Sequence, residues 1–258
     1  MFGIRKVSVR RAREQGEKPF WISFSDLMSA LMVLFLVAMS VALLAVTKKV
    51  SEEERLDKER IEAIDRLMEE IKAVVSVEEF KDVRVIGNTI DFGPRGRFER
   101  EGQNTLSPSQ RELVLRFTPK LLEKLRSTDA GRHWFTRAVV EGYASPTGKY
   151  LFNLNLSLER SERVICELLH QPPAGEVALS PEDRKLIATK FFVGGASFNK
   201  LRTTAVGGDE DNRRIEFKLD FKTRRERKEE EDNPPPEVSD AQLMQALDPK
   251  ERCPLLDR

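Results

Sequence analysis

The sequence predicts a single N-terminal transmembrane helix, a short coiled coil and then an α/β domain. Three observations lead to this fold class: an uncharged apolar run over residues 27–46, apolar residues at coiled-coil spacing in residues 61–75, and alternating helix and strand patterns over residues 80–221. With 258 residues, the chain has room for one or two compact domains. Its net charge of +1 shows no footprint of direct nucleic acid binding.

The apolar run reads LMSALMVLFLVAMSVALLAV. A helix of this length matches a hydrocarbon core roughly 30 Å thick. A secretory signal peptide is the alternative, but the run exceeds the usual apolar region of such a peptide and no small-residue cleavage site follows. We therefore expect a transmembrane helix over residues 21–46, with Phe20 and Trp21 at the membrane interface.

The charges on either side of this span predict its orientation. Basic residues predominate before it, whereas residues 48–60 carry mixed charges. Because positive residues favour the cytoplasm, residues 1–20 are expected to form a cytoplasmic basic tail and the rest of the chain to lie outside. In a bacterium, this places a single-pass protein in the inner membrane with its C-terminal domain in the periplasm.

Residues 47–79 are predicted to form a periplasmic linker and a coiled-coil helix. Apolar residues recur every three or four positions, as in a coiled-coil seam, at Ile61, Ile64, Met68, Ile71 and Val75. Short isolated helices are marginal in water, so pairing with a second copy is expected. The alternative is a lone amphipathic helix that packs on its own domain.

Residues 80–222 are predicted to form the α/β domain. Strands are expected over residues 83–92, 136–143, 191–193 and 214–221, and helices over residues 109–126, 153–169 and 181–189. Ser107 or Ser109 is expected to cap the first helix. Residues 223–258 hold a charge run and a proline spacer, which are interpreted as a solvated C-terminal tail.

Asp26 is the one charged residue in the apolar stretch from Phe20 to Val46. Near the interface a carboxylate can simply begin a helix, where the helix dipole favours it. Apolar residues on both sides of Asp26, however, extend the span past it. Since a carboxylate within lipid must face another protein or a water path, the sequence indicates a partner membrane protein.

The segment Trp21–Met32 resembles the B subunits of ion-driven motors, the MotB, ExbD and TolR group. Its run DLMSALM is similar to the aspartate and Met-Thr-Ala-type run of that group, with Ser29 where threonine is common. The resemblance implies that Asp26 takes up the translocated ion, a proton or alternatively sodium. It also implies that Ser29 helps to shape this site.

Three motifs in the globular region resemble the OmpA-like peptidoglycan-binding domain, of βαβαβ type: VEGYAS at residues 140–145, NLNLSLERS at residues 153–161 and NRRIE at residues 212–216. The resemblance implies binding of the diaminopimelate-bearing stem peptide of the cell wall. Arg160 matches the arginine that contacts a ligand carboxylate, and Asn153 and Leu156 match residues that line the same groove.

The match departs from the family pattern at two further positions. Ser145 replaces the usual aspartate, which removes a charged partner for the ligand's ammonium, and Phe152 stands where tyrosine is often found. Arg213 is also a candidate wall-binding residue, although a strand arginine can simply orient the fold. The alternative for Arg160 is an exposed helix arginine that pairs with a neighbouring glutamate.

The order of these parts matches MotB, whereas ExbD and TolR lack a full OmpA-like domain. The span PFWISFSDLMSALMVLFLVAM is most similar to the ZorB family of the Zorya anti-phage defence system. The resemblance implies a homodimer inside a pentameric ZorA/MotA-like subunit, anchored to peptidoglycan and embedded in the lipid bilayer. The implied function is the stator B subunit of a rotary motor; the alternatives are a flagellar MotB-type subunit and a passive wall tether.

No enzyme, cofactor or metal site is expected. His133 and His170 lie far apart without ligand spacing, and Cys166 and Cys253 are too sparse for a zinc site. Free thiols rarely persist in an oxidising periplasm, so the two cysteines are disulfide candidates. An intrachain bond is slightly favoured; the alternatives are an intermolecular Cys253 pair and two separate thiols.

Overall fold

The computed structural model describes residues 20–170, 178–204, 210–236, 238–248, 251 and 253, apart from the side chains of Phe20, Ile22 and Ser23. The expected basic tail before Phe20 lies outside the described residues. The chain divides into two units, residues 1–56 and residues 57–258.

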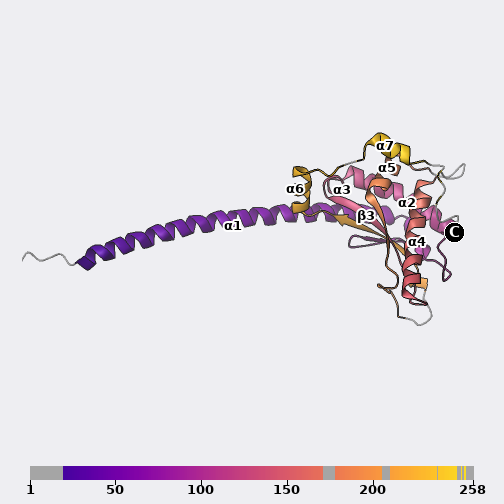
Figure 1. Ribbon diagram of the computed structural model, residues 1–258, viewed down its shortest axis with the longest axis horizontal. Helices are drawn as coiled ribbons and strands as arrows, with labels where there is room; N and C mark the ends of the chain where they lie inside the picture. The colour runs from indigo at the N-terminus through magenta and orange to yellow at the C-terminus, as the bar shows by residue number, and fades with distance from the viewer. Residues whose placement is uncertain are drawn as a thin grey trace, which may run out of the picture. The chain divides into compact units, whose positions relative to one another are not determined.

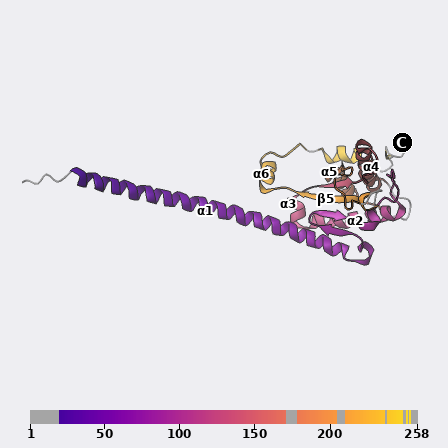
Figure 2. The same cartoon turned by 90° about the horizontal axis from the view of Figure 1, so that it is seen from below.

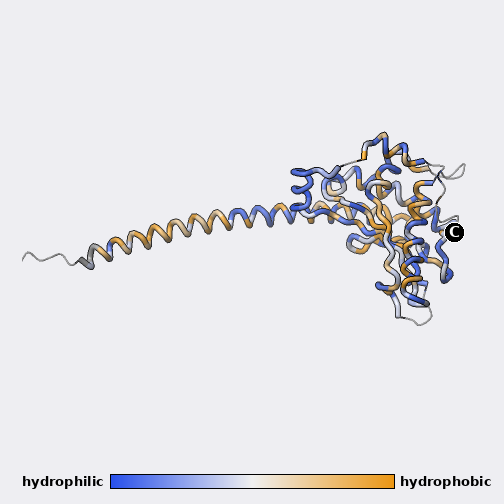
Figure 3. Tube along the Cα trace, in the orientation of Figure 1, coloured by the Kyte–Doolittle hydropathy of each residue, from blue (hydrophilic) through white to orange (hydrophobic). Residues whose placement is uncertain are grey.

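The first unit is helical and apolar. Helix α1 (Phe20–Val75) begins at the apolar stretch and runs through it without a break (Figure 1). Its side chains from Phe24 to Val46 are exposed, and the hydropathy falls farther along the helix (Figure 3). Ser40 donates to the carbonyl of Leu36 over 2.7 Å, which satisfies its hydroxyl within the helix. Among the described residues, this is the one helix long and apolar enough to cross a membrane. It fits a single-pass inner-membrane protein.

The later part of α1, which belongs to the second unit, packs on the domain of its own chain. Ile64, Met68, Ile71 and Val75 are buried in one core with that domain, whereas Ile61 is 52% exposed. The prediction that these residues pair with a second copy is therefore wrong at the four buried positions, which contact the chain's own domain. Heptad spacing marks an apolar stripe on a helix, and here the chain covers that stripe with its own core.

A five-stranded sheet in the order β1-β2-β5-β3-β4 forms the centre of the domain. Its strands are β1 (Arg84–Ile86), β2 (Thr89–Asp91), β3 (Phe135–Gly142), β4 (Phe191–Gly195) and β5 (Ile215–Phe221). Strand β4 runs parallel to β3, and the other neighbouring strands are antiparallel. Because side chains alternate across a strand, Val140 and Phe217 face the core together, and Glu141 and Glu216 share the opposite, polar face.

Besides the domain portion of α1, further helices pack against the sheet and contribute to its core (Figures 1 and 2). They are α2 (Pro108–Ser127), α4 (Tyr150–Leu169) and α5 (Pro181–Lys190), with the short α3 (Asp129–His133) after α2. Ser107 caps α2 in a capping box with Gln110, as one of the two expected caps. Phe92 joins sheet and helix, because its ring lies edge-on to Phe217 at 4.8 Å and to Phe117 at 5.6 Å.

Residues 83–92 do not form the single strand expected from their apolar content. They form the hairpin of β1 and β2, in which Ile86 pairs with Thr89. Gly87 in the turn has φ +56°, a left-handed conformation that tight hairpin turns use and that glycine adopts without a steric cost.

The charge run, interpreted as a solvated linker, has no buried residues, but it folds into a helix. Residues Arg224–Asp232 form helix α6, and a further helix, α7 (Asp240–Ala246), follows the proline spacer. Thr223 caps α6 in a capping box, and Arg225 pairs with Glu229 over 2.8 Å. The Arg227 guanidinium lies 4.7 Å from the Trp134 ring centroid. Opposite charges four residues apart were the helical signal in this run.

Candidate functional site

The membrane helix presents Asp26 on a face of small and branched residues. Asp26, Ser29, Ala30, Val33 and Val37 line a shallow groove along α1. They share this face because residues three and four apart are neighbours on a helix. Among the residues that the structure describes, none donates a hydrogen bond to the Asp26 carboxylate. The groove therefore brings together Asp26, predicted to take up the ion, and Ser29, predicted to shape its site, and the Asp26 side chain is exposed along the helix.

In the second unit, the NLNLSLERS motif lies on α4, which packs very closely on the sheet. Gly142 ends β3 directly beneath the helix, and a Cβ atom there would lie 1.9 Å from the carbonyl oxygen of Ser157. Gly195 ends β4 in a similar position, where an added Cβ atom would lie 2.9 Å from the carbonyl oxygen of Leu154. Two glycines on neighbouring strands thus allow the backbone of α4 to approach the sheet.

The small polar residues of this motif fasten α4 to the end of β4. Ser157 accepts a hydrogen bond from the backbone N–H of Ser197 at 3.0 Å, and Ser161 donates to the carbonyl of Gly194 at 2.9 Å. Asn153, which is buried, donates to the carbonyl of Thr147 at 2.7 Å. The motif therefore has a structural role, which fixes the direction in which Arg160 leaves the helix.

Arg160 is fully buried, which corrects the alternative of an exposed helix arginine. Its Nε donates to the carbonyl of Gln103 at 2.8 Å, and its Nη1 donates to the carbonyl of Tyr143 at 2.6 Å. The guanidinium carbon lies 4.4 Å from the Phe98 ring centroid. Within the described part of the chain, Nη2 has no hydrogen-bond partner. Burial, and then the charge of Arg213, lower the pKa of Arg160 to about 9.

Arg213 shows what the NRRIE motif does for the fold. Its Nε donates to the carbonyl of Phe98 at 2.9 Å and its Nη2 to the carbonyl of Glu99 at 2.7 Å. Asn212 likewise binds backbone, accepting from the N–H of Arg202 at 2.7 Å. These contacts favour the alternative in which Arg213 orients the fold over the one in which it binds the cell wall.

The remaining predicted wall-binding residues fall into different environments. Ser145 and Leu156 are buried, with 4% and 5% of their surface exposed, whereas Phe152 is 61% exposed. Arg160 and Arg213 interact electrostatically, and Asn153 lies two turns before Arg160 on α4. The structure thus brings the two arginines together under residues 98–103, a segment in which the sequence showed no motif.

The sequence also missed a charged network on the polar face of the sheet. Glu216 accepts from Arg214 at 2.8 Å and from Arg202 at 2.9 Å, and Arg202 also pairs with Asp91 at 2.8 Å. Burial alone raises the pKa of Glu216, but hydrogen bonds and charge from Arg214 and Arg202 outweigh burial and lower it. Burial, followed by the charge of Glu216, raises the pKa of Tyr143, whose ring lies 3.9 Å from the Arg214 guanidinium. The network explains the final glutamate of the NRRIE motif.

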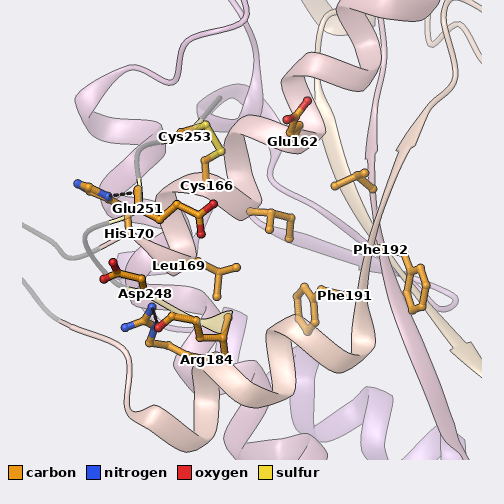
Figure 4. Close-up of a pocket in the computed structure, with 13 residues that line it drawn as sticks. Glu162, Cys166, Leu169, His170, Arg184, Phe191, Phe192, Asp248, Glu251 and Cys253 are labelled. Atoms are coloured by element: carbon orange, nitrogen blue, oxygen red, sulfur yellow. Dashed lines mark hydrogen bonds between the residues drawn. A yellow bond between two sulfur atoms is a disulfide. The ribbon is translucent and has the colours of Figure 1, made fainter. Parts of the chain in front are cut away.

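A disulfide joins Cys166 on α4 to Cys253, 87 residues later, and both sulfurs border a cavity of about 510 Å³ (Figure 4). The cavity lies between α4, α5, β4 and the C-terminal segment; Phe191 and Leu247 supply apolar walls. His170 contacts the carbonyl of Glu251 at 3.3 Å beside the disulfide. The structure therefore contains the intrachain bond that the sequence slightly favoured.

Comparison with known proteins identifies relatives of this chain. No family model matches the sequence. The Zorya protein ZorB of Escherichia coli O139:H28 (strain E24377A / ETEC) is 37% identical over 238 residues, which cover 91% of this chain and 93% of that protein.

Solved structures share much less of the sequence. The periplasmic domain of Helicobacter pylori MotB is 14% identical, with a TM-score of 0.39 over 58% of this chain and 94% of that one. The OmpA-like domain of FopA1 from Francisella tularensis subsp. tularensis SCHU S4 is 16% identical, with a TM-score of 0.34 over 55% and 82%. The relationship rests on the sequence match along nearly the whole length of both proteins: this chain belongs to the ZorB family of Zorya proteins.

Proposed function

We propose that this chain is the stator B subunit of an inner-membrane, ion-driven motor that is anchored to peptidoglycan and acts in anti-phage defence. Membership of the ZorB family supports this function. The single observation that carries it is the groove on α1, where the only charged residue of the apolar stretch from Phe20 to Val46 lies among small and branched side chains. A carboxylate is costly in lipid, and such residues mark ion pathways.

In this proposal Asp26 accepts the translocated ion, a proton, and Ser29 shapes the same site. Protonation removes the charge of the carboxylate, which lowers the cost of its facing the membrane interior. Deprotonation restores the charge, and a partner or water path must then solvate it. A membrane potential contributes about 2.3 kcal/mol per charge per 100 mV, so a few ions supply useful work. Sodium is the alternative ion.

The partner of this groove is proposed to be a pentameric channel subunit of the ZorA/MotA type, which surrounds two copies of this chain. The N-terminus lies in the cytoplasm and the C-terminal domain in the periplasm. Because Ile64, Met68 and Ile71 are buried within the chain, contacts between the two copies must use other residues.

Wall anchoring is proposed to depend on Arg160. In the described part of the chain no carboxylate pairs with its guanidinium, which contacts backbone carbonyls and an aromatic ring instead. A buried charge without a countercharge is costly, so a carboxylate of the stem peptide would supply what the site lacks. Asn153 and Leu156 position the helix that carries Arg160, and Ser145 offers a hydroxyl where the family has a carboxylate.

The test of the motor function is Asp26→Asn in cells that express the complete defence system. The amide has almost the same shape but cannot take up a proton, so protection against phage should be lost while the protein still inserts into the membrane. Ser40→Ala is the matched control, because Ser40 bonds within its own helix and should tolerate the change. Full protection by Asp26→Asn would instead favour a passive wall tether. Protection that persists without sodium supports the proton.

A further inference from the structure

The donors of the two buried arginines are occupied by one segment of the chain's own backbone. We call residues 98–104 the cover segment. Arg160 donates to the carbonyl of Gln103 at 2.8 Å, and Arg213 donates to the carbonyls of Phe98 and Glu99 at 2.9 and 2.7 Å. A carbonyl oxygen and a carboxylate oxygen accept the same N–H groups. The cover segment therefore occupies donors that a ligand carboxylate would use.

The cover segment also closes access to Arg160. None of the surface of Arg160 is exposed, and its Nη2 is buried without a hydrogen-bond partner in the described residues. The ring of Phe98, at the start of the segment, lies over the guanidinium at 4.4 Å. A ligand can reach Arg160 only if these residues move.

The far end of the segment contacts the helix that carries Arg160 through the carbonyl of Gln103 and through the side chain of Asn104. Asn104 donates to one carboxylate oxygen of Glu159 at 2.9 Å. Between the two ends, residues 99–102 are exposed, and Gly102 turns the chain with φ +73°. Phe98 is anchored in the core, so the part of the segment that can open is residues 99–104. A stretch with few buried contacts belongs to the parts of a protein that open most readily.

We propose that residues 98–104 form an autoinhibitory cover over Arg160, latched by the hydrogen bond between Asn104 and Glu159. This inference rests on the proposed wall binding. A ligand carboxylate replaces the carbonyl of Gln103 at Arg160 and also engages the free Nη2. The apparent affinity for the wall is then reduced by the fraction of molecules in which the cover is closed.

The same glutamate provides a matched control. The second carboxylate oxygen of Glu159 accepts from Asn155 at 2.7 Å, and Asn155 is an exposed residue of the same helix. Asn104→Ala removes the contact to the cover segment. Asn155→Ala removes an equivalent amide from the same carboxylate and leaves the cover segment untouched.

Two measurements on the full-length protein in detergent test the proposal. Labelling by phenylglyoxal, followed by peptide mapping, reports the accessibility of Arg160; co-sedimentation with purified peptidoglycan sacculi reports wall binding. Loss of one hydrogen bond to a charged carboxylate shifts the opening equilibrium about ten- to a hundredfold. Asn104→Ala should increase both labelling of Arg160 and retention by sacculi within that range, whereas Asn155→Ala should match the wild type.

Each other outcome overturns a different part of the argument. Unchanged labelling of Arg160 in Asn104→Ala would mean that Asn104 is not a latch. Increased labelling with unchanged retention, while Arg160→Ala lowers retention, would mean that the cover does not inhibit binding. If neither the wild type nor any variant is retained by sacculi, wall binding itself is wrong and the inference fails with it.

Discussion

Arg60 of α1 donates from Nε to the main-chain carbonyl of Lys222 at 2.8 Å, across 162 residues of sequence. The acceptor immediately follows β5, and the Arg60 guanidinium also lies 5.8 Å from the ring centroid of Trp134, just before β3. One side chain thus connects the domain portion of α1 to two central strands of the sheet. The stripe of α1 that resembles a coiled coil is held in its own domain by this polar contact as well as by apolar burial.

Arg60→Ala should destabilise the second unit by about 1 kcal/mol, since a partly buried hydrogen bond from a charged group is lost. Thermal unfolding of the detergent-solubilised chain, followed by circular dichroism, measures the change. Arg66→Ala is the matched control, because Arg66 is exposed on the same helix. Equal stability of the two variants would show that the contact to Lys222 contributes nothing.

Gly142→Ala should destabilise the domain strongly, by about 3 kcal/mol, because the added Cβ would lie 1.9 Å from the carbonyl oxygen of Ser157. Neither backbone can yield without separating α4 from the sheet. Gly194→Ala is a milder comparison, since its nearest neighbour is a Val139 methyl at 3.3 Å. Denaturant unfolding of both variants decides the point; a wild-type midpoint for Gly142→Ala would contradict the close approach.

Arg160→Ala combined with Asn153→Ala should weaken retention on peptidoglycan sacculi about tenfold or more, because one charge-assisted contact contributes about 1.5–3 kcal/mol. Arg213→Ala separates binding from folding: it loses contacts to two backbone carbonyls and should lower stability. All proteins must be compared well below their melting temperatures. Equal retention of the double variant and the wild type would mean that the domain does not use Arg160 for the wall.

Cys253→Ser should lower the melting temperature in oxidising buffer, because the disulfide closes a loop across 87 residues of sequence. The chain-entropy model gives about 4–5 kcal/mol for a loop of this size, and measured effects are often smaller. Cys166→Ser should have the same effect, and the double variant should be no worse. Non-reducing peptide mapping provides the independent readout; recovery of both cysteines as separate alkylated thiols would exclude the bond.

Glu216→Gln should flatten the acid limb of the stability profile. Arg214 and Arg202 hold the pKa of Glu216 below its ordinary value of 4.5, so the folded state favours the charged form. The stabilisation is therefore present above that value and is lost as the pH falls through the lower pKa of the folded state. Unfolding free energies measured from pH 3 to pH 7 test this; an unchanged acid slope in Glu216→Gln would assign the slope to other carboxylates.

Sequence patterns were sufficient for the elements with long periodic segments. The capping box at Ser107 and the alternation of Ile215, Phe217 and Leu219 are local signals, and both mark the elements found. What covers an apolar stripe is not a local property, which is why the spacing of Ile64 and Ile71 suggested a second chain although the same chain buries them.

In the candidate site, too, local sequence signals were recognisable and long-range contacts were not. Asp26 and Arg160 were recognisable from their surroundings in the sequence, but the segment that covers Arg160 was not. Its contacts to the two arginines use backbone carbonyls of Phe98, Glu99 and Gln103, which every residue type has. These pairs are far apart in the sequence: 57 residues separate Gln103 from Arg160, and 115 separate Phe98 from Arg213. Only the folded structure brings them into contact.

Trp134 also gives the molecule an internal optical reporter. The chain has two tryptophans, and Trp134 lies near the guanidinium of Arg60 from α1 and that of Arg227 from α6. Indole emission responds to nearby charge and to water, so detachment of either helix changes the spectrum of this ring. With Trp21→Phe in the membrane unit, the remaining fluorescence comes from Trp134 alone. Rearrangement of α1 against its domain can then be followed in real time in the assembled complex, if its partner subunits are made without tryptophan, and no attached dye is needed.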